Sequence, residues 1–486
     1  MGNNNENSCP LEQEMARKGE ELAVRQLMRG RQLTDLTLAR IVQNVESREA
    51  DITNMMAATK GRCDKSLRRM VTEAVVGAAD GLLLCRDYSQ RSQSNQELLV
   101  FTGSHWELVA PALWKDFVDR CARRCGLPET YLKDHAFMNQ QYENVAFNLK
   151  ACVERFVPVD EVWLNVSNGT LELKRDGRVE LREHRKEDMF TYTLPYCYDA
   201  QAESPQWQHF LDRVLPETEA QQVLAEFIGY CLMPDHRFEK MLWLQGDGQN
   251  GKSVTLEIVE SLLGTVNVSY LSLSDLTNDA IKRAGIEDKM LNVSHESGRD
   301  VNANVLKQLA SGERVTIERK YKDPREINNY GKFCAAFNQL PRAEVTGGYM
   351  RRIIILPYNV TISEEEKDDQ LAQKLKTELP GILNWVLKAL PPLMKRRAFT
   401  ASDICKKALN SYLMQSDNVR LFCSEMCEPC DYATSGNTLF DAYKNYCGDA
   451  LLKPLGKGNF YKRLDALTHS RVDNANVTYF KLRLKE

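Results

Sequence analysis

The sequence lacks any long apolar run, since no stretch of about 18 consecutive apolar residues occurs in the chain. A helix that crosses a bilayer needs about 20 predominantly apolar residues, so helical membrane spans are excluded. Residues 1–7 are polar and acidic instead of basic and apolar, which is not the pattern of a signal peptide. We therefore expect a protein that stays where it is made, in the cytoplasm of its host cell, without a membrane partner.

The sequence also lacks a dominant charge. Its 486 residues carry a formal net charge of −3, with 43% hydrophobic and 27% charged residues. These proportions are typical of a globular protein, and the length is sufficient for about two to four domains with separate cores. The small net charge excludes a uniformly basic nucleic-acid-binding protein, so contacts with nucleic acid must come from local basic patches.

Cysteine is not scarce, with 14 residues, but its spacing gives no clear metal site. The densest group is Cys423, Cys427 and Cys430, with Cys447 further along. This group has the residue types of a four-cysteine zinc site. The alternative is a set of reduced cysteines packed as small apolar residues. We favour this alternative because Cys423 and Cys427 lie four apart in a segment of helical character.

Proline is missing between residues 11 and 110. Within this stretch Leu38, Ile41 and Val45 are apolar and follow helical spacing. We therefore predict a mostly helical region over residues 10–82, whose function cannot be inferred from its pattern. Several of its arginines could face nucleic acid, although a solvated helix surface is the simpler interpretation.

The chain is organised around a segment that reads Gly-Asp-Gly-Gln-Asn-Gly-Lys-Ser. An apolar stretch, Met241–Leu244, precedes it as a predicted strand, and Val254, Ile258 and Leu262 follow it with helical spacing. A strand, a glycine-rich loop and a helix form a phosphate-binding loop, because loop amides and a helix N-terminus attract anions. The loop residues are Gly246, Asp247, Gly248, Gln249, Asn250, Gly251, Lys252 and Ser253.

Two residues of this loop have predicted chemical roles. Lys252 is expected to reach the β- and γ-phosphates, and Ser253 is expected to hold Mg²⁺ through its hydroxyl. A tight turn with an exposed lysine is the alternative, but the flanking strand and helix argue against it. The sequence therefore predicts a nucleoside triphosphate site, with ATP and Mg²⁺ as its ligands.

Polar residues follow two further predicted strands. Glu296 follows the buried-strand candidate 290–294 and His295, and Asn338 directly follows the apolar stretch 333–337. A strand-end glutamate beside a phosphate loop can polarise the attacking water and contribute to the Mg²⁺ site, while an asparagine can contact the γ-phosphate or that water. Each residue alone could be a strand-end cap, but together they favour a catalytic interpretation.

Basic residues gather in two places after the loop. Arg319, Lys320 and Lys322 lie in a charged segment that is either an exposed hairpin or a loop that grips a phosphodiester backbone. Arg351 and Arg352 follow a pair of glycines. They could form local salt bridges, or reach the ATP of a neighbouring subunit as an arginine finger.

The combination of these features between residues 246 and 352 resembles a superfamily 3 helicase of the AAA+ type. More narrowly, the chain resembles the phage, plasmid and poxvirus primase-helicase family. The stretch 163–173, WLNVSNGTLEL, is similar to the domain that precedes the helicase in that family. Residues 306–313 resemble the segment that leads to its DNA-binding hairpin, and residues 439–447 resemble part of its winged-helix end.

The resemblance implies an α/β fold with an AAA+ P-loop core at residues 216–400. A helical region at 1–90 and a mixed α/β domain at 91–215 precede the core, and a winged helix at 401–486 follows it. It also implies an ATP-dependent replicative DNA helicase that forms a ring, a hexamer, and moves 3′ to 5′ on single-stranded or forked DNA. A separate primase or polymerase is a further expected partner.

The resemblance also assigns roles to the candidate residues. Lys252 and Ser253 would hold ATP and Mg²⁺, Glu296 would activate water, and Asn338 would orient it. Arg351, with Arg352 as second choice, would complete the site of the adjacent subunit. The hairpin would follow the central strand through Arg319, Lys320 and Lys322.

Two departures from the family pattern are visible. Many AAA+ enzymes carry an acidic residue before the catalytic glutamate, whereas this chain has His295 there. The family often has an N-terminal primase or polymerase domain, but residues 1–90 are too few for one and contain no Asp-x-Asp pair. We therefore do not expect primase activity.

The C-terminal stretch from Cys447 to Glu486 is basic, with eight lysines and arginines against four acids, a net charge of +4. A helical pattern at 459–468 and an alternating strand at 477–482 fit a winged helix on DNA. A basic module for protein contacts is the alternative. For the whole chain, an ATP-dependent initiator that assembles on an origin, or a P-loop phosphotransferase, also remains open.

Overall fold

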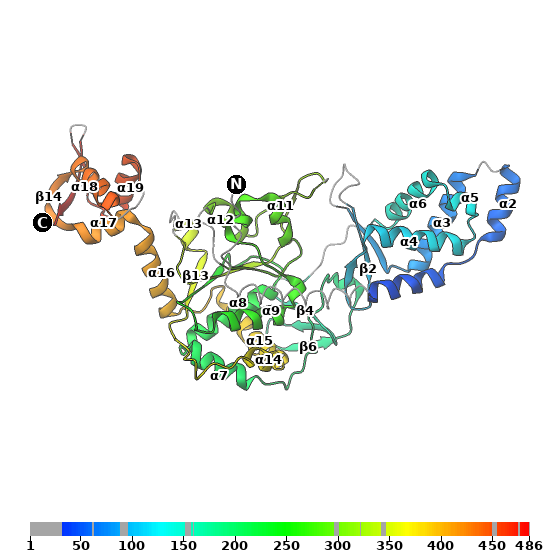
Figure 1. Ribbon diagram of the computed structural model, residues 1–486, viewed down its shortest axis with the longest axis horizontal. Coiled ribbons are helices and arrows are strands. Elements are labelled where there is room, and N and C mark those ends of the chain that lie inside the picture. Colours follow the sequence, from blue (N-terminus) through cyan, green and yellow to red (C-terminus); the bar gives the residue numbers. More distant parts are fainter. Residues whose placement is uncertain are drawn as a thin grey trace.

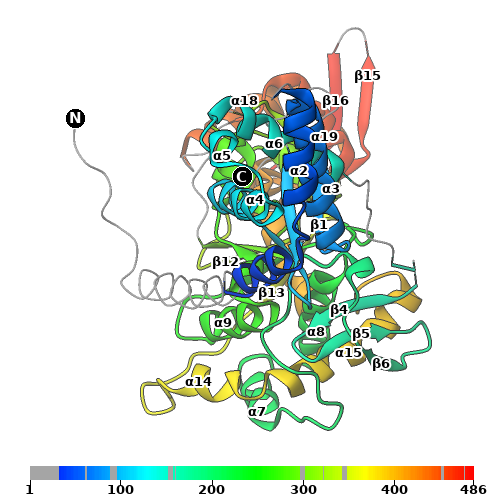
Figure 2. The same cartoon turned by 90° about the vertical axis from the view of Figure 1, so that its right-hand side faces the viewer.

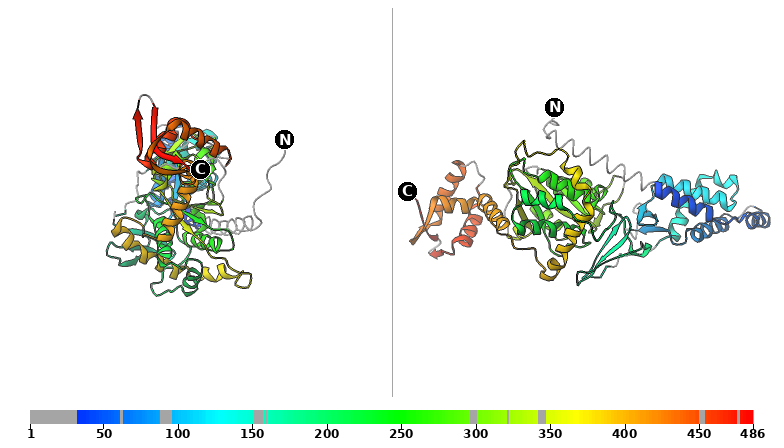
Figure 3. Two further views of the ribbon diagram at one scale, coloured as in Figure 1. Left: turned by 90° about the vertical axis from the view of Figure 1, so that its left-hand side faces the viewer. Right: turned by 90° about the horizontal axis from the view of Figure 1, so that it is seen from below.

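The computed structural model describes residues 32–60, 63–87, 96–150, 157–158, 160–295, 301–320, 322–341, 347–449, 454–474 and 477–485. A mostly helical N-terminal unit, a central α/β unit and a small C-terminal unit follow one another along the molecule (Figure 1). Seen from below, the N-terminal unit (blue and cyan) and the C-terminal unit (orange) again lie on opposite sides of the centre (Figure 3).

The N-terminal unit confirms the predicted helical region wherever that region is described, while residues 10–31 lie outside the described part of the chain. Its buried apolar residues form one core, which includes Leu38, Val71, Phe117 and Val145. One helix covers residues 32–44. The others are α2 (Glu49–Thr59), α3 (Asp64–Ala79), α4 (Pro111–Cys125), α5 (Glu129–Leu132) and α6 (His135–Asn148).

A three-stranded antiparallel sheet completes this unit, in the order β1 (Leu83–Asp87), β2 (Gln96–Phe101), β3 (Trp106–Leu108). Gly103-Ser104 between two apolar stretches predicts a hairpin turn, and β2 pairs with β3 across it. Strand β1 pairs with β2, so a boundary at residue 90 falls within one sheet.

A second small sheet links the N-terminal and central units. It consists of β4 (Val162–Val166), β5 (Gly169–Leu173) and β6 (Val179–Arg182). Asn168-Gly169 between two alternating apolar runs predicts a hairpin turn, and the pairing of β4 with β5 confirms it. Gly169 has a φ of 153°, and a Cβ there would lie 2.3 Å from the carbonyl oxygen of Arg182. Glycine is therefore required at this turn. Figure 2 shows this sheet beside α8 and α15, with which it shares a hydrophobic core.

The central unit is built on a five-stranded parallel sheet, which confirms the expected α/β class. Neighbouring strands are parallel throughout, so their carboxyl ends meet at one edge. Most of their residues are buried, as expected for a parallel sheet covered on both faces. The strand order is β13 (Ile353–Pro357), β7 (Met241–Gln245), β12 (Lys332–Phe337), β9 (Leu291–His295), β8 (Val268–Ser269).

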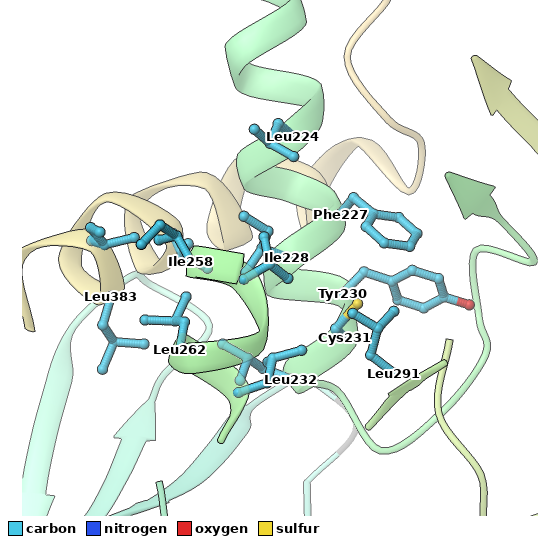
Figure 4. Packing of buried hydrophobic residues seen from close by; sticks show 14 of the residues in the cluster. Leu224, Phe227, Ile228, Tyr230, Cys231, Leu232, Ile258, Leu262, Leu291 and Leu383 are labelled. Atoms are coloured by element: carbon cyan, nitrogen blue, oxygen red, sulfur yellow. The ribbon is translucent and has the colours of Figure 1, made fainter. Parts of the chain in front are cut away.

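Strand β7 shows how the two faces of the sheet are filled. Leu242 and Leu244 belong to one core, whereas Met241 and Trp243 belong to the other. On the first face, Leu224, Ile258 and Leu383 pack together, each from a different helix (Figure 4). The helices of the unit are α7 (Pro205–Val214), α8 (Thr218–Leu232), α9 (Lys252–Leu263), α10 (Leu273–Asn278), α11 (Ala280–Arg283), α12 (Ala303–Ala310), α13 (Gly347–Met350), α14 (Leu371–Lys376), α15 (Leu379–Arg396) and α16 (Asp403–Ser416).

The C-terminal unit has its own core, in which Tyr443 and Phe460 stack with ring centroids 4.5 Å apart. The expected helix and strand at its end are both present. Cys423 is helical, but Cys427 begins a strand, so the expectation of one helix containing both cysteines was wrong. The elements are α17 (Asn418–Met426), β14 (Cys427–Ser435), α18 (Gly436–Asp449), α19 (Lys457–Thr468), β15 (Arg471–Asn474) and β16 (Val477–Leu484).

Candidate nucleotide and nucleic-acid sites

The predicted phosphate loop joins the carboxyl end of β7 to the start of α9, as expected. Its backbone is in the left-handed region at Gly248 (φ 105°), Gln249 (45°) and Gly251 (88°). Gly246 is required by space, because a Cβ there would lie 2.4 Å from the carbonyl oxygen of Tyr358. This geometry curls the loop around its lysine.

Lys252 is buried at the first position of α9. Its Nζ donates to the carbonyl oxygen of Gly246 (2.5 Å) and to Oδ1 of Asn250 (3.2 Å) and Asn338 (3.5 Å). Burial lowers the pKa of Lys252, and the nearby Asp247 opposes this shift. Oxygen acceptors thus surround the ammonium group, and phosphate oxygens could replace them with stronger, charged hydrogen bonds.

Asn338 lies where the sequence predicted it, directly after β12. Strand β12 pairs with β7 on one side and with β9 on the other. The amide of Gly246 also donates to the carbonyl oxygen of Phe337 (3.1 Å), which holds the loop against the end of β12. The structure therefore brings Lys252 and Asn338 together from positions 86 residues apart.

The residues expected to bind metal are placed only in part. The side chain of Ser253 is exposed on the first turn of α9, next to Lys252, where its hydroxyl fits a Mg²⁺ ion bound with a triphosphate. Glu296 lies outside the described residues, and His295 before it is exposed at the end of β9. In the described segments, no three His, Cys, Asp or Glu side chains form a group that could hold a metal ion.

The two arginines differ sharply in environment. The side chain of Arg351 is 67% exposed, with Glu239 3.5 Å away, whereas that of Arg352 is 10% exposed. Arg352 donates to Oγ of Ser311 (2.7 and 2.9 Å) and to the carbonyl oxygen of Gly348 (2.7 Å). Arg352 is therefore held by its own chain, while Arg351 faces outward.

Arg351 and Arg352 lie at the edge of the sheet opposite the phosphate loop. They precede β13, whose first residue, Ile353, pairs with Met241, the first residue of β7. The loop follows the last residue of β7, so roughly 16 Å of strand separates the two positions. Sequence spacing alone could not reveal this separation.

The charged segment after α12 forms the expected hairpin, in which β10 (Val315–Ile317) pairs with β11 (Arg325–Ile327). Lys320 and Lys322 are exposed between these strands. Arg319 instead donates to Glu287 (2.7 Å). Of the three residues predicted to contact nucleic acid, Lys320 and Lys322 are thus exposed to solvent, whereas Arg319 is paired within the protein.

Several charged residues around the hairpin were not singled out from the sequence. Arg283 is buried and donates to three carbonyl oxygens, among them that of Thr316 in β10 (2.8 Å). Glu97, from the N-terminal sheet, and Glu287 both contact Arg325. No local signal could reveal Glu97, because it is more than two hundred residues from its partners on the hairpin.

Two family models match the chain. A family of unknown function (DUF5906) matches residues 244–352, which carry the phosphate loop, the hairpin and the arginine pair. A family described as D5 N terminal like matches residues 83–216, which carry the two antiparallel sheets and α7. Among the described residues, no helix is long and apolar enough to cross a membrane.

Viral proteins are among the curated relatives. Putative helicase L207/L206 of Acanthamoeba polyphaga mimivirus is 24% identical over 179 residues, 35% of this chain and 18% of that protein. Putative helicase 184R of Invertebrate iridescent virus 6 is 24% identical over 233 residues, 44% of this chain and 24% of that protein. The matches thus span a quarter or less of these relatives' own length.

Solved structures of the NrS-1 C-terminal region, in apo forms, are also similar. Two of them are each 11% identical to this chain. One covers 80% of this chain and 94% of its own, with a TM-score of 0.44. The other covers 85% of this chain and 99% of its own, with a TM-score of 0.47.

Proposed function

We propose that this chain, which belongs to the phage and viral primase-helicase family, is an ATP-dependent DNA helicase with an AAA+ core of superfamily 3. In this proposal it assembles as a ring, a hexamer, and moves 3′ to 5′ along single-stranded DNA at a replication fork. A separate primase or polymerase would act beside it.

One observation carries the proposal: the phosphate loop and Arg351 occupy opposite edges of one parallel sheet. Arg351 cannot reach the phosphates of its own chain across roughly 16 Å of strand. An exposed arginine on that edge is suited to a neighbouring subunit, as in arginine fingers supplied in trans. A P-loop phosphotransferase that works as a single chain would have no use for it.

The residues of the loop have separable roles in this mechanism. The loop amides and Lys252 bind the β- and γ-phosphates, and Ser253 contributes a hydroxyl ligand to Mg²⁺. Bound Mg²⁺ would neutralise negative charge on the phosphate oxygens. Asn338, whose Oδ1 lies 3.5 Å from Nζ of Lys252, would orient the attacking water or the γ-phosphate. Activation of that water remains assigned to Glu296 by resemblance.

DNA would be contacted at two places. Lys320 and Lys322 are exposed on the hairpin and are suited to backbone phosphates. The C-terminal unit runs helix, strand, helix, helix and then a two-stranded hairpin, which is the element order of a winged helix. Its α19 carries the exposed Lys457 and Lys462, so this unit supports a second contact to duplex DNA.

Strand displacement on forked DNA is the direct test. Wild-type protein with ATP should release the labelled strand from a fork with a 3′ loading tail, and should fail on a fork with only a 5′ tail. Release from the 5′ tail alone would reverse the proposed polarity. ATP-dependent assembly on DNA without any release would favour the initiator role over the helicase role.

A further inference from the structure

A network of six charged side chains joins the N-terminal unit to the hairpin between β10 and β11. We call the base of this hairpin, where Arg319 and Arg325 contact Glu287, the hairpin root. Glu97 on β2 lies 3.5 Å from Arg319 and 3.6 Å from Arg325. Glu287 lies 2.7 Å from Arg319 and 2.6 Å from Arg325. Arg86 on β1 bridges Glu97 (2.9 Å) and Asp288 (3.2 Å). Three arginines thus face three acids.

The two glutamates hold the hairpin arginines differently. Glu287 is 3% exposed and makes short contacts to both, so it is a fixed part of the hairpin root. Glu97 reaches the same arginines at longer distances, and its short contact is to Arg86. Glu97 can therefore leave Arg319 and Arg325 while it remains paired with Arg86.

A carboxylate between two guanidinium groups occupies the kind of place that a phosphate takes in nucleic-acid complexes. Arg319 is 36% exposed, so an incoming anion can reach it from solvent. Lys320 and Lys322, which are exposed nearby on the hairpin, would attract the same backbone. Exchange of Glu97 for a phosphodiester would conserve charge, because each carries one negative charge.

We propose that Arg319 and Arg325 form a phosphate subsite for the DNA backbone at the hairpin root, which Glu97 closes when DNA is absent. The N-terminal unit then restrains DNA binding by the central unit, and DNA that engages the hairpin displaces the Glu97 carboxylate. This inference rests on the proposed DNA-binding function and adds Arg325 and Glu97 to it.

The test compares Glu97→Gln with wild type and with Glu73→Gln, using the full chain and a fluorescent single-stranded oligonucleotide. Glu73 is a matched control, since it is an exposed glutamate that pairs with Arg69 on the same helix. Glu97→Gln should bind DNA about three- to tenfold more tightly at low salt, and this gain should shrink as salt rises. Glu73→Gln should bind like wild type.

A second variant separates closure of the subsite from folding. Glu97→Asp keeps the charge beside Arg86 but withdraws it from the hairpin arginines, so it should give a smaller gain in affinity. Arg319→Gln should lower the slope of log affinity against log salt by about 0.7, the loss of one phosphate contact on a single strand.

The outcomes distinguish the inference from the proposed function. Unchanged or weaker DNA binding by both folded Glu97 variants, with binding by wild type intact, would overturn the subsite and leave the helicase proposal standing. Binding by Glu97→Gln when wild type shows none would support closure in its strongest form. No binding by any variant at low salt would overturn both.

Discussion

At the scale of single residues, the phosphate loop is the part of the molecule that its sequence describes best. Eight consecutive residues specify both a chemistry and a backbone shape, and the loop has the left-handed glycines that such a shape needs. Asn338 was also predictable, because it ends an apolar strand. The burial of Arg352 was not, since its partner Ser311 lies 41 residues earlier in the chain.

Lys252→Ala should reduce ATP hydrolysis by at least about a hundredfold, because it removes the cation placed for the phosphates. Phosphate release under saturating ATP measures the effect. Lys388→Ala, on the exposed side of α15, is the matched control and should hydrolyse ATP like wild type. Near-normal hydrolysis by Lys252→Ala would show that this loop is not the site of ATP hydrolysis.

Glu260 on α9 makes stability depend on pH. Burial raises its pKa to about 7, despite the hydrogen bond that the Tyr270 hydroxyl donates to it (2.9 Å). Between pH 4.5 and pH 7 the folded chain therefore keeps a proton on Glu260. The unfolded chain, in which this group has an ordinary pKa near 4.5, has lost that proton. Stability should fall as pH rises from 4.5 through 7, by roughly 3 kcal/mol at most.

Glu260→Gln removes this titration and should reduce the loss of stability between pH 5 and pH 8. Urea unfolding at both pH values, followed by circular dichroism, measures the difference. If the variant and wild type lose equal stability over this interval, Glu260 is not the group responsible.

At the scale of elements, continuous apolar runs predicted β7 and β12, because a parallel sheet buries both faces of its strands. Turn residues predicted the two antiparallel hairpins. Strands with neither signal were not predicted from the sequence. Strand β14, for example, carries Pro429 and a register shift, so it has neither a regular alternation nor a continuous apolar run.

The hairpin between β10 and β11 should act as a unit toward DNA. Lys320→Ala combined with Lys322→Ala should weaken binding to a single strand at low salt and lower the slope of log affinity against log salt by about 1.4, or 0.7 per lost phosphate contact. Fluorescence anisotropy over a salt series measures both quantities. Lys133→Ala, an exposed lysine of the N-terminal unit, serves as control. Wild-type affinity in the double variant would exclude the hairpin from DNA binding.

At the scale of the whole molecule, the separation of Arg351 from the loop predicts complementation between defective subunits. Arg351→Ala keeps an intact loop, and Lys252→Ala keeps an intact arginine. Each alone should hydrolyse ATP poorly. Mixed in equal amounts, they should regain activity at about one quarter of the interfaces, since contributors are chosen at random.

The measurement is steady-state hydrolysis of the two variants, separately and after mixing at constant total concentration. Recovery should vanish when Arg351→Ala is mixed with a chain that carries both substitutions, because no intact arginine is then present. If mixing gives only the average of the separate rates, Arg351 does not act between subunits.

The placement of Arg351 at the far edge of the sheet has a consequence for dilution. In the proposed ring, each copy contributes its phosphate loop to one reaction centre and its Arg351 to another, so a solitary copy would complete neither. ATP turnover per molecule should therefore fall steeply once the protein is dilute enough for the subunits to dissociate, even while every subunit stays folded.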